Sequence, residues 1–134
     1  MKKIEHIGIA VRDLDAAEER WASLLGHGPY KREEVASEGV ITSFFDAGGV
    51  KIELLASLEA GGVIDRFVER RGEGIHHIAF ASDDLQAEIR RLQSEGFRLI
   101  NTEPRPGADN KMVVFVHPAS TGGVLIEFCQ ERDR

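Results

Sequence analysis

The sequence predicts an α+β fold built from two tandem β-α-β-β-β modules, and two observations support this prediction. The first is an internal repeat: residues 5–14, EHIGIAVRDL, match residues 76–85, HHIAFASDDL, and residues 49–55, GVKIELL, match residues 123–129, GVLIEFC. The second is the order of apolar alternation, helical stripes and turn residues, which is the same in both halves. The halves are therefore expected to be two copies of one unit.

Each half begins with a short apolar strand, at residues 4–11 and 76–82, followed by an aspartate suited to cap a helix, Asp13 or Asp84. Each helix is expected to bury one stripe of its surface and to stop at a glycine, Gly26 or Gly96. The buried stripes are Leu14, Ala17, Trp21, Leu24 and Leu25 in the first helix and Leu85, Ile89 and Leu92 in the second. Three extended stretches complete each half, at residues 30–36, 40–47 and 50–56 and at residues 97–102, 111–117 and 123–130.

The chain has the length of one ordinary domain, and we expect a single domain over residues 1–134. Module one covers about residues 3–56, a connector helix residues 61–72, and module two about residues 74–131. The connector places Ile64, Phe67 and Val68 on one face, and no low-complexity linker interrupts it. We therefore expect it to pack against the modules.

Composition excludes several classes of function. The formal net charge is −6, with 23 acidic and 17 basic residues, and no basic run offers a surface to nucleic acid or to an anionic membrane. Cys129 is the only cysteine, so an internal disulfide is impossible. We expect Cys129 to pack as a small apolar side chain. No apolar run has the length of a signal peptide or a membrane span, so we expect a cytoplasmic protein.

Alternation along the first strand of each half separates two faces. His6, Gly8 and Ala10 share one face, and His77, Ala79 and Ala81 share the equivalent face. The bulky faces should carry the helices; they are formed by Ile7, Ile9 and Val11 and by His76, Ile78 and Phe80. Each histidine on the other face is followed by very small residues, which indicates a hollow beside the imidazole.

Two glutamates occupy equivalent positions in the last strand of each half. Glu53 lies between Ile52 and Leu54, and Glu127 occurs in the same setting, so each carboxylate points away from the apolar face. A carboxylate in a core strand is costly unless it is paired, solvated or bound to a cation. Two histidines and two glutamates at repeat-equivalent positions therefore predict a site for a borderline divalent metal.

The other histidines are expected to have structural roles. His76 faces the apolar side and is predicted to be a hydrogen-bonded packing residue. His27 reads as an exposed turn residue, and His117, which precedes a proline, as a turn residue or a group supporting the metal ligands.

These features resemble the vicinal oxygen chelate superfamily and, within it, the methylmalonyl-CoA/ethylmalonyl-CoA epimerase family. The similar stretches are HIGIAVRDL, KIELL, GEGIHHIAF and EPRPGADNKMVVFVHPASTGGVLIE, which together extend over nearly the whole chain. The last run is specific to the epimerases. The resemblance implies the glyoxalase/bleomycin-resistance/dioxygenase fold, in which the two modules form one curved mixed sheet with the helices outside.

The resemblance also implies a divalent metal, with Co²⁺ expected first and Mn²⁺, Ni²⁺ or Zn²⁺ as alternatives. Its ligands would be His6, His77 and Glu127, with Glu53 at the fourth position. Certain epimerases carry a catalytic glutamate on the preceding strand, where this chain has Thr42. Glu53 then becomes the substitute base beside Glu127.

The activity implied is epimerisation of methylmalonyl-CoA by 1,1-proton transfer through a metal-stabilised enediolate. Groups expected to contact the acyl-CoA are Arg105, Lys111, Ser120 and Thr42, and a homodimer is expected from the fold. A glyoxalase I-type lactoylglutathione lyase and a metal-free small-molecule-binding protein of the same fold are the alternatives. An extradiol dioxygenase is less favoured, because a ligating Glu53 would fill a position that oxygen or catechol requires.

Overall fold

The computed structural model describes residues 2–132, which form two compact units. One unit, called here the N-terminal unit, contains residues 6–76. The other, called the C-terminal unit, combines residues 77–132 with residues 2–5. The single-domain assignment and its module boundaries stay predictions.

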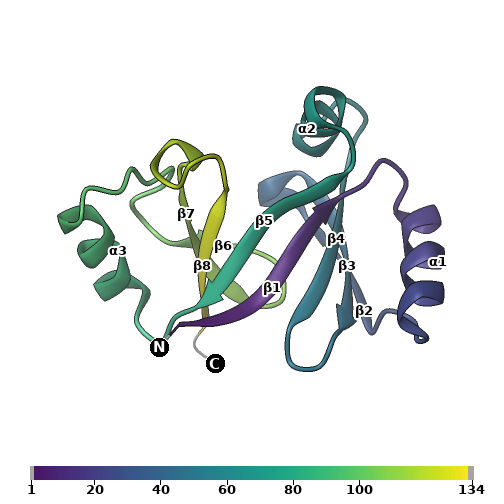
Figure 1. Cartoon of the computed structure of the whole chain (residues 1–134), viewed down its shortest axis with the longest axis horizontal. Helices are drawn as coiled ribbons and strands as arrows, with labels where there is room; N and C mark the ends of the chain where they lie inside the picture. The colour runs from purple at the N-terminus through teal and green to yellow at the C-terminus, as the bar shows by residue number, and fades with distance from the viewer. Residues whose placement is uncertain (1, 133–134) are drawn as a thin grey trace. The chain divides into compact units, whose positions relative to one another are not determined.

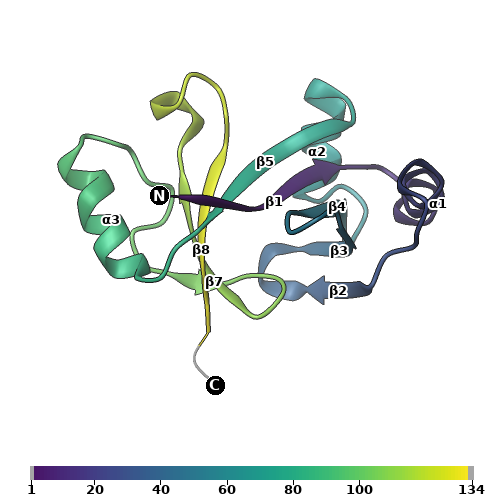
Figure 2. The same cartoon turned by 60° about the horizontal axis from the view of Figure 1, so that its bottom comes forward.

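The N-terminal unit has a four-stranded mixed sheet in the order β2-β3-β4-β1. Strands β1 and β4 run parallel, and β2, β3 and β4 are joined by antiparallel pairing (Figure 2). The elements are β1 (Lys3–Ala10), α1 (Leu14–Leu25), β2 (Lys31–Val35), η1 (Ala36–Glu38), β3 (Val40–Asp46), β4 (Lys51–Ser57) and α2 (Val63–Arg71).

The C-terminal unit repeats this arrangement with the strand order β5-β8-β7-β6, and β5 and β8 are again parallel (Figure 1). Its elements are β5 (Gly74–Ala81), α3 (Leu85–Ser94), β6 (Arg105–Pro106), β7 (Lys111–Val116), η2 (Pro118–Ser120) and β8 (Ile126–Glu131). The predicted α+β class with two β-α-β-β-β modules is confirmed. In the part of the chain that the structure describes, no helix has the length and apolarity to cross a membrane.

The helices begin and pack largely as predicted. Asp13 and Asp84 cap α1 and α3 by accepting hydrogen bonds from the amides of Ala16 and Ala87. Gly26 ends α1 in the left-handed conformation, with φ of 82°. The prediction for Leu24 is wrong: its side chain is 68% exposed, because it lies outside the stripe that meets the sheet.

Both helices cover the bulky faces of their sheets. In the N-terminal unit, α1 packs on Val11, Phe45 and Leu54, with Ile9 and Ile52 beside them. In the C-terminal unit, α3 packs on a matching set that contains Val114, Val116 and Phe128, with Phe80 and Ile126 beside them. The opposite face of each sheet is therefore the one that carries the histidine and the glutamate.

The extended stretch predicted at residues 97–102 is confirmed only in part. The structure has only an isolated bridge between Leu99 and Val116, followed by the two-residue strand β6. Around this bridge the Ile100 amide donates to the Phe115 carbonyl and the His117 amide donates to the Arg98 carbonyl, both at 2.8 Å. The next contacts with the β7 backbone come from the Asn101 side chain. Its Nδ2 donates to the Val113 carbonyl at 3.1 Å, and its Oδ1 accepts from the Phe115 amide at 2.9 Å.

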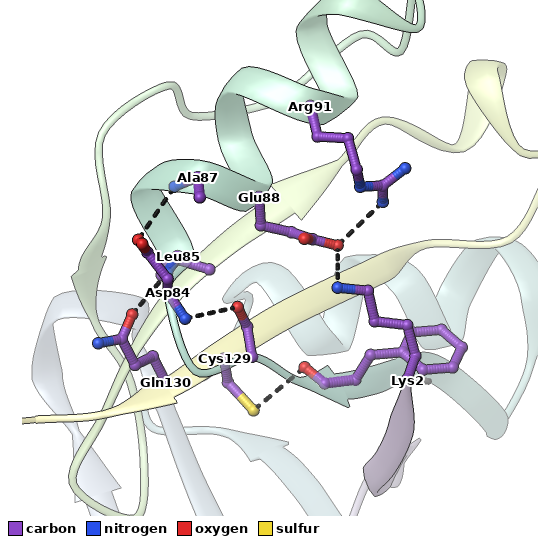
Figure 3. Close-up of polar contacts among 10 residues, drawn as sticks. Lys2, Asp84, Leu85, Ala87, Glu88, Arg91, Cys129 and Gln130 are labelled. Atoms are coloured by element: carbon purple, nitrogen blue, oxygen red, sulfur yellow. Dashed lines mark hydrogen bonds and ion pairs between the residues drawn. The ribbon is translucent and has the colours of Figure 1, made fainter.

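Glu88 is a buried acid on the outer helix α3 of the C-terminal unit, and it is 6% exposed. Lys2 Nζ lies 2.6 Å and Arg91 Nη2 lies 2.9 Å from its Oε1. Figure 3 marks both contacts with dashed lines. Burial raises the pKa of Glu88, but the hydrogen bonds from Arg91 and Lys2 outweigh burial and leave the pKa below its ordinary value. Glu88 thereby ties the N-terminal segment to α3.

We expect Glu88→Gln to lower the free energy of unfolding at pH 7 by about 1–2 kcal/mol, since it removes two charge-assisted hydrogen bonds whose cations are partly solvated. A lowered folded-state pKa stabilises the fold above the unfolded pKa of about 4.3, and this contribution is lost as pH falls through the folded value. The difference from wild type should therefore shrink at pH 3. Urea unfolding at both pH values measures it, with Glu19→Gln, an exposed α1 residue, as control.

Candidate functional site

In the N-terminal unit, His6 and Glu53 meet on the face of the sheet opposite α1. His6 Nε2 lies 3.3 Å from Glu53 Oε1. Both residues are buried, at 5% and 4% exposure. Parallel pairing puts Gly8 directly beside Glu53, so His6 is one diagonal step away on the same face. Gly8 has no side chain to separate imidazole and carboxylate.

The C-terminal unit reproduces this arrangement with His77 and Glu127. His77 Nε2 lies 3.4 Å from Glu127 Oε1, and the two residues are 3% and 6% exposed. Ala79 pairs with Glu127 as Gly8 pairs with Glu53. The alternation of side chains along the strands predicted these four residues, but it did not indicate that each histidine contacts the glutamate of its own half.

The donor types in these two pairs fit a divalent metal. Imidazole nitrogen and carboxylate oxygen are ligands of Zn²⁺ and of the neighbouring divalent transition metals. A buried carboxylate needs a partner to offset its desolvation, and a cation is one such partner for the carboxylate of each pair. Each unit therefore supplies half of the predicted ligand set.

Thr42 lies on the same face as Glu53 and is fully buried. Its hydroxyl donates to the Glu33 carbonyl at 3.4 Å. Glu33 sits directly opposite Thr42 on β2 and pairs with Lys31 at 3.3 Å. Sequence reasoning missed Glu33, although register places its carboxylate on the face where Thr42 replaces the glutamate of certain epimerases.

The residues expected to contact the acyl-CoA differ in their surroundings. Lys111 is 6% exposed, and its Nζ donates to Glu131 Oε1 at 2.9 Å and to the Asp109 carbonyl at 3.3 Å. Ser120 Oγ accepts from the Arg98 amide at 2.9 Å. Arg105 is exposed. Substrate contact by Lys111, Ser120 and Thr42 stays a prediction.

The remaining histidines and the cysteine serve local structure. His76 packs edge-on to the Phe67 ring of the connector helix α2, with ring centroids 4.8 Å apart. His117 Nδ1 accepts from the Ala119 amide at 3.0 Å and so caps η2. His27, an exposed turn residue, has Nε2 2.8 Å from the Asp46 carbonyl. Cys129 is buried, as expected for a small apolar residue.

A family model described as the Glyoxalase/Bleomycin resistance protein/Dioxygenase superfamily matches residues 5–115. Among curated proteins, the chain is 36% identical over 130 residues to an ethylmalonyl-CoA/methylmalonyl-CoA epimerase of Cereibacter sphaeroides, covering 96% of this chain and 97% of that protein. It is 37% identical over 132 residues to an uncharacterized protein of Bacillus subtilis, covering 98% of this chain and 94% of that one.

Among solved structures, the methylmalonyl-CoA epimerase of Mycobacterium tuberculosis is similar with a TM-score of 0.90 and 37% identity. The alignment covers 97% of this chain and 88% of that one. These findings confirm the resemblance that the repeated motifs indicated.

Proposed function

Because the chain belongs to the Glyoxalase/Bleomycin resistance protein/Dioxygenase superfamily, we propose that it is a metal-dependent methylmalonyl-CoA epimerase. The observation that carries the proposal is the matched pair of buried His–Glu contacts, His6 with Glu53 and His77 with Glu127. Similarity to epimerases over nearly the full chain supports the substrate class.

We propose that the two pairs together bind one divalent ion, with Co²⁺ as the preferred metal, in a homodimeric enzyme. Repeat equivalence supports a shared ion, because a single His–Glu pair provides fewer ligands than such sites use. When bound, the ion supplies a Lewis acid that stabilises the negative charge developing when the α-proton leaves.

The protein's own groups have two tasks in this proposal. The histidines hold the ion without adding charge, so the developing anion is not repelled. Glu53 and Glu127 come from separate, repeat-equivalent strands and act as the two acid/base groups, one removing the α-proton and the other returning a proton to the opposite face. A positioned acid or base accelerates such a step by roughly 10²- to 10⁴-fold.

We expect Glu53→Gln to keep the metal but to lower the epimerisation rate by roughly 10²- to 10⁴-fold. The amide oxygen of glutamine still coordinates a cation, whereas the amide cannot accept the α-proton. Metal content by elemental analysis and turnover by an epimerisation assay measure the two effects separately.

Glu33→Gln is the matched control, because Glu33 is another carboxylate on this face of the N-terminal unit's sheet. It should retain at least half of the wild-type rate. If Glu33→Gln lost the activity while Glu53→Gln kept it, the base assignment would belong to Glu33.

The proposed function is tested by proton NMR of 2-methylmalonyl-CoA in D₂O. Addition of cobalt to the apo protein should cause the α-proton signal to disappear at a rate proportional to enzyme concentration. Absence of exchange in the cobalt-loaded protein would reject the epimerase. Turnover of the glutathione hemithioacetal of methylglyoxal would then favour the glyoxalase I alternative. Purification of the protein without bound metal would favour the metal-free binding protein.

A further inference from the structure

Arg105 lies at the start of β6 in the C-terminal unit, on the same face of the sheet as His77 and Glu127. β6 pairs with β7, and Arg105 stands directly opposite Val113. Directly paired residues share a face, and Val113 packs with Ala79 on the side opposite α3. The guanidinium thus projects over the surface that carries the predicted ligands.

The guanidinium rests on an aromatic platform. Its carbon lies 5.9 Å from the ring centroid of Phe115, two residues along β7 from Val113. This cation–π contact restrains an otherwise flexible side chain. Among residues 2–132, no carboxylate pairs with Arg105, although the protein has an excess of acidic residues. Arg105 is therefore held in place and exposed without its charge being neutralised.

Phe115 also contacts the predicted metal ligand His77. The two rings meet edge to face, with centroids 6.2 Å apart and an interplanar angle of 86°. Phe115 pairs directly with Glu127 in the β7–β8 ladder, and its amide is held by Asn101 Oδ1. The Phe115 ring thus contacts both the exposed Arg105 guanidinium and the His77 imidazole.

We propose that Arg105 binds an oxyanion of the acyl-CoA substrate. Phe115 is then the positioning residue that orients the side chains of both Arg105 and His77. This inference rests on the proposed function. A guanidinium presents a planar fork of donors that matches a carboxylate or a phosphate, and the platform reduces the entropy lost on binding. The oxyanion is either the malonyl carboxylate or a phosphate of the coenzyme.

Two substrates distinguish the sources of the oxyanion: methylmalonyl-CoA and methylmalonyl-pantetheine, which keeps the carboxylate and lacks the nucleotide phosphates. Arg105→Gln should raise KM for methylmalonyl-CoA by roughly 10- to 100-fold, the effect of losing a charged hydrogen bond. A similar increase for the pantetheine thioester identifies the carboxylate, and an increase confined to the CoA thioester identifies a phosphate.

Arg90→Gln is the control, because Arg90 is also an exposed arginine and lies on α3. Its KM should stay within twofold of wild type. If Arg105→Gln also stayed within twofold for both substrates, the inference would be overturned. Isothermal titration calorimetry with methylmalonyl-CoA compares the affinities of the same proteins without turnover. A wild-type protein that binds this substrate but does not epimerise it would reject only the proposed function. A wild type that does not bind methylmalonyl-CoA would overturn both.

The role of Phe115 predicts a split between two measurements. Phe115→Leu should raise KM as Arg105→Gln does and should also weaken cobalt affinity by roughly tenfold, in the range of supporting-residue effects at metal sites. Arg105→Gln should leave cobalt affinity unchanged. Phe115→Tyr keeps the ring and should restore both properties. Unchanged KM and cobalt affinity in folded Phe115→Leu would contradict the positioning role, as would loss of both properties in folded Phe115→Tyr.

Discussion

Glu127→Gln should reduce the α-proton exchange of methylmalonyl-CoA by at least roughly 10³-fold, the largest loss expected from any single substitution. Glu127 is proposed as both a metal ligand and an acid/base group, and a positioned base alone contributes roughly 10²- to 10⁴-fold. Its carboxylate oxygen lies 3.4 Å from His77 Nε2 in a buried setting, so solvent cannot replace it. Glutamine preserves the shape of the side chain and should preserve the fold.

NMR exchange in D₂O measures this loss, and urea unfolding of the same preparation excludes a folding defect. Glu95→Gln is the control, since Glu95 is exposed at the end of α3. A Glu127→Gln protein that kept more than one tenth of the wild-type exchange rate would remove Glu127 from the proposed chemistry.

His77→Ala should abolish cobalt binding, whereas the neighbouring His76→Ala should retain it. Successive strand residues point to opposite faces. His77 therefore contacts Glu127, while His76 packs on Phe67 of the connector helix. Loss of the His76 ring should instead lower the free energy of unfolding by about 1–2 kcal/mol, the scale of a lost aromatic pair and its buried area.

Titration of cobalt into the two apo variants separates these roles, and thermal unfolding reports on stability. The opposite pattern, with cobalt bound by His77→Ala and lost in His76→Ala, would show that the strand faces are assigned incorrectly.

The internal repeat made much of the fold predictable. The strand that follows each glycine-rich turn carries its glutamate between apolar neighbours, and this alternation located Glu53 and Glu127 before any register was known. The capping aspartates Asp13 and Asp84 were equally predictable from the sequence, because a cap acts within one turn of its helix.

Apart from the exposed Leu24, the errors and omissions came from contacts between residues distant in sequence. Asn101 bonds the β7 backbone through its side chain, and residues 97–102 carry no pattern that indicates this. Burial of Glu88 depends on Lys2, 86 positions earlier in the chain. The platform formed by Phe115 depends on strand register. Its only signal in the sequence is the alternation of KMVVFV, which puts Lys111, Val113 and Phe115 on one face.

We propose that the two repeat-equivalent His–Glu pairs bind the same metal ion. A direct test is the metal content of the cobalt-saturated, desalted protein, measured by mass spectrometry of the intact folded chain. We expect one ion per chain in the wild type and none in either His6→Ala or His77→Ala. Two ions per chain, or one ion that survives both single substitutions, would show that the pairs act independently and would contradict the proposal.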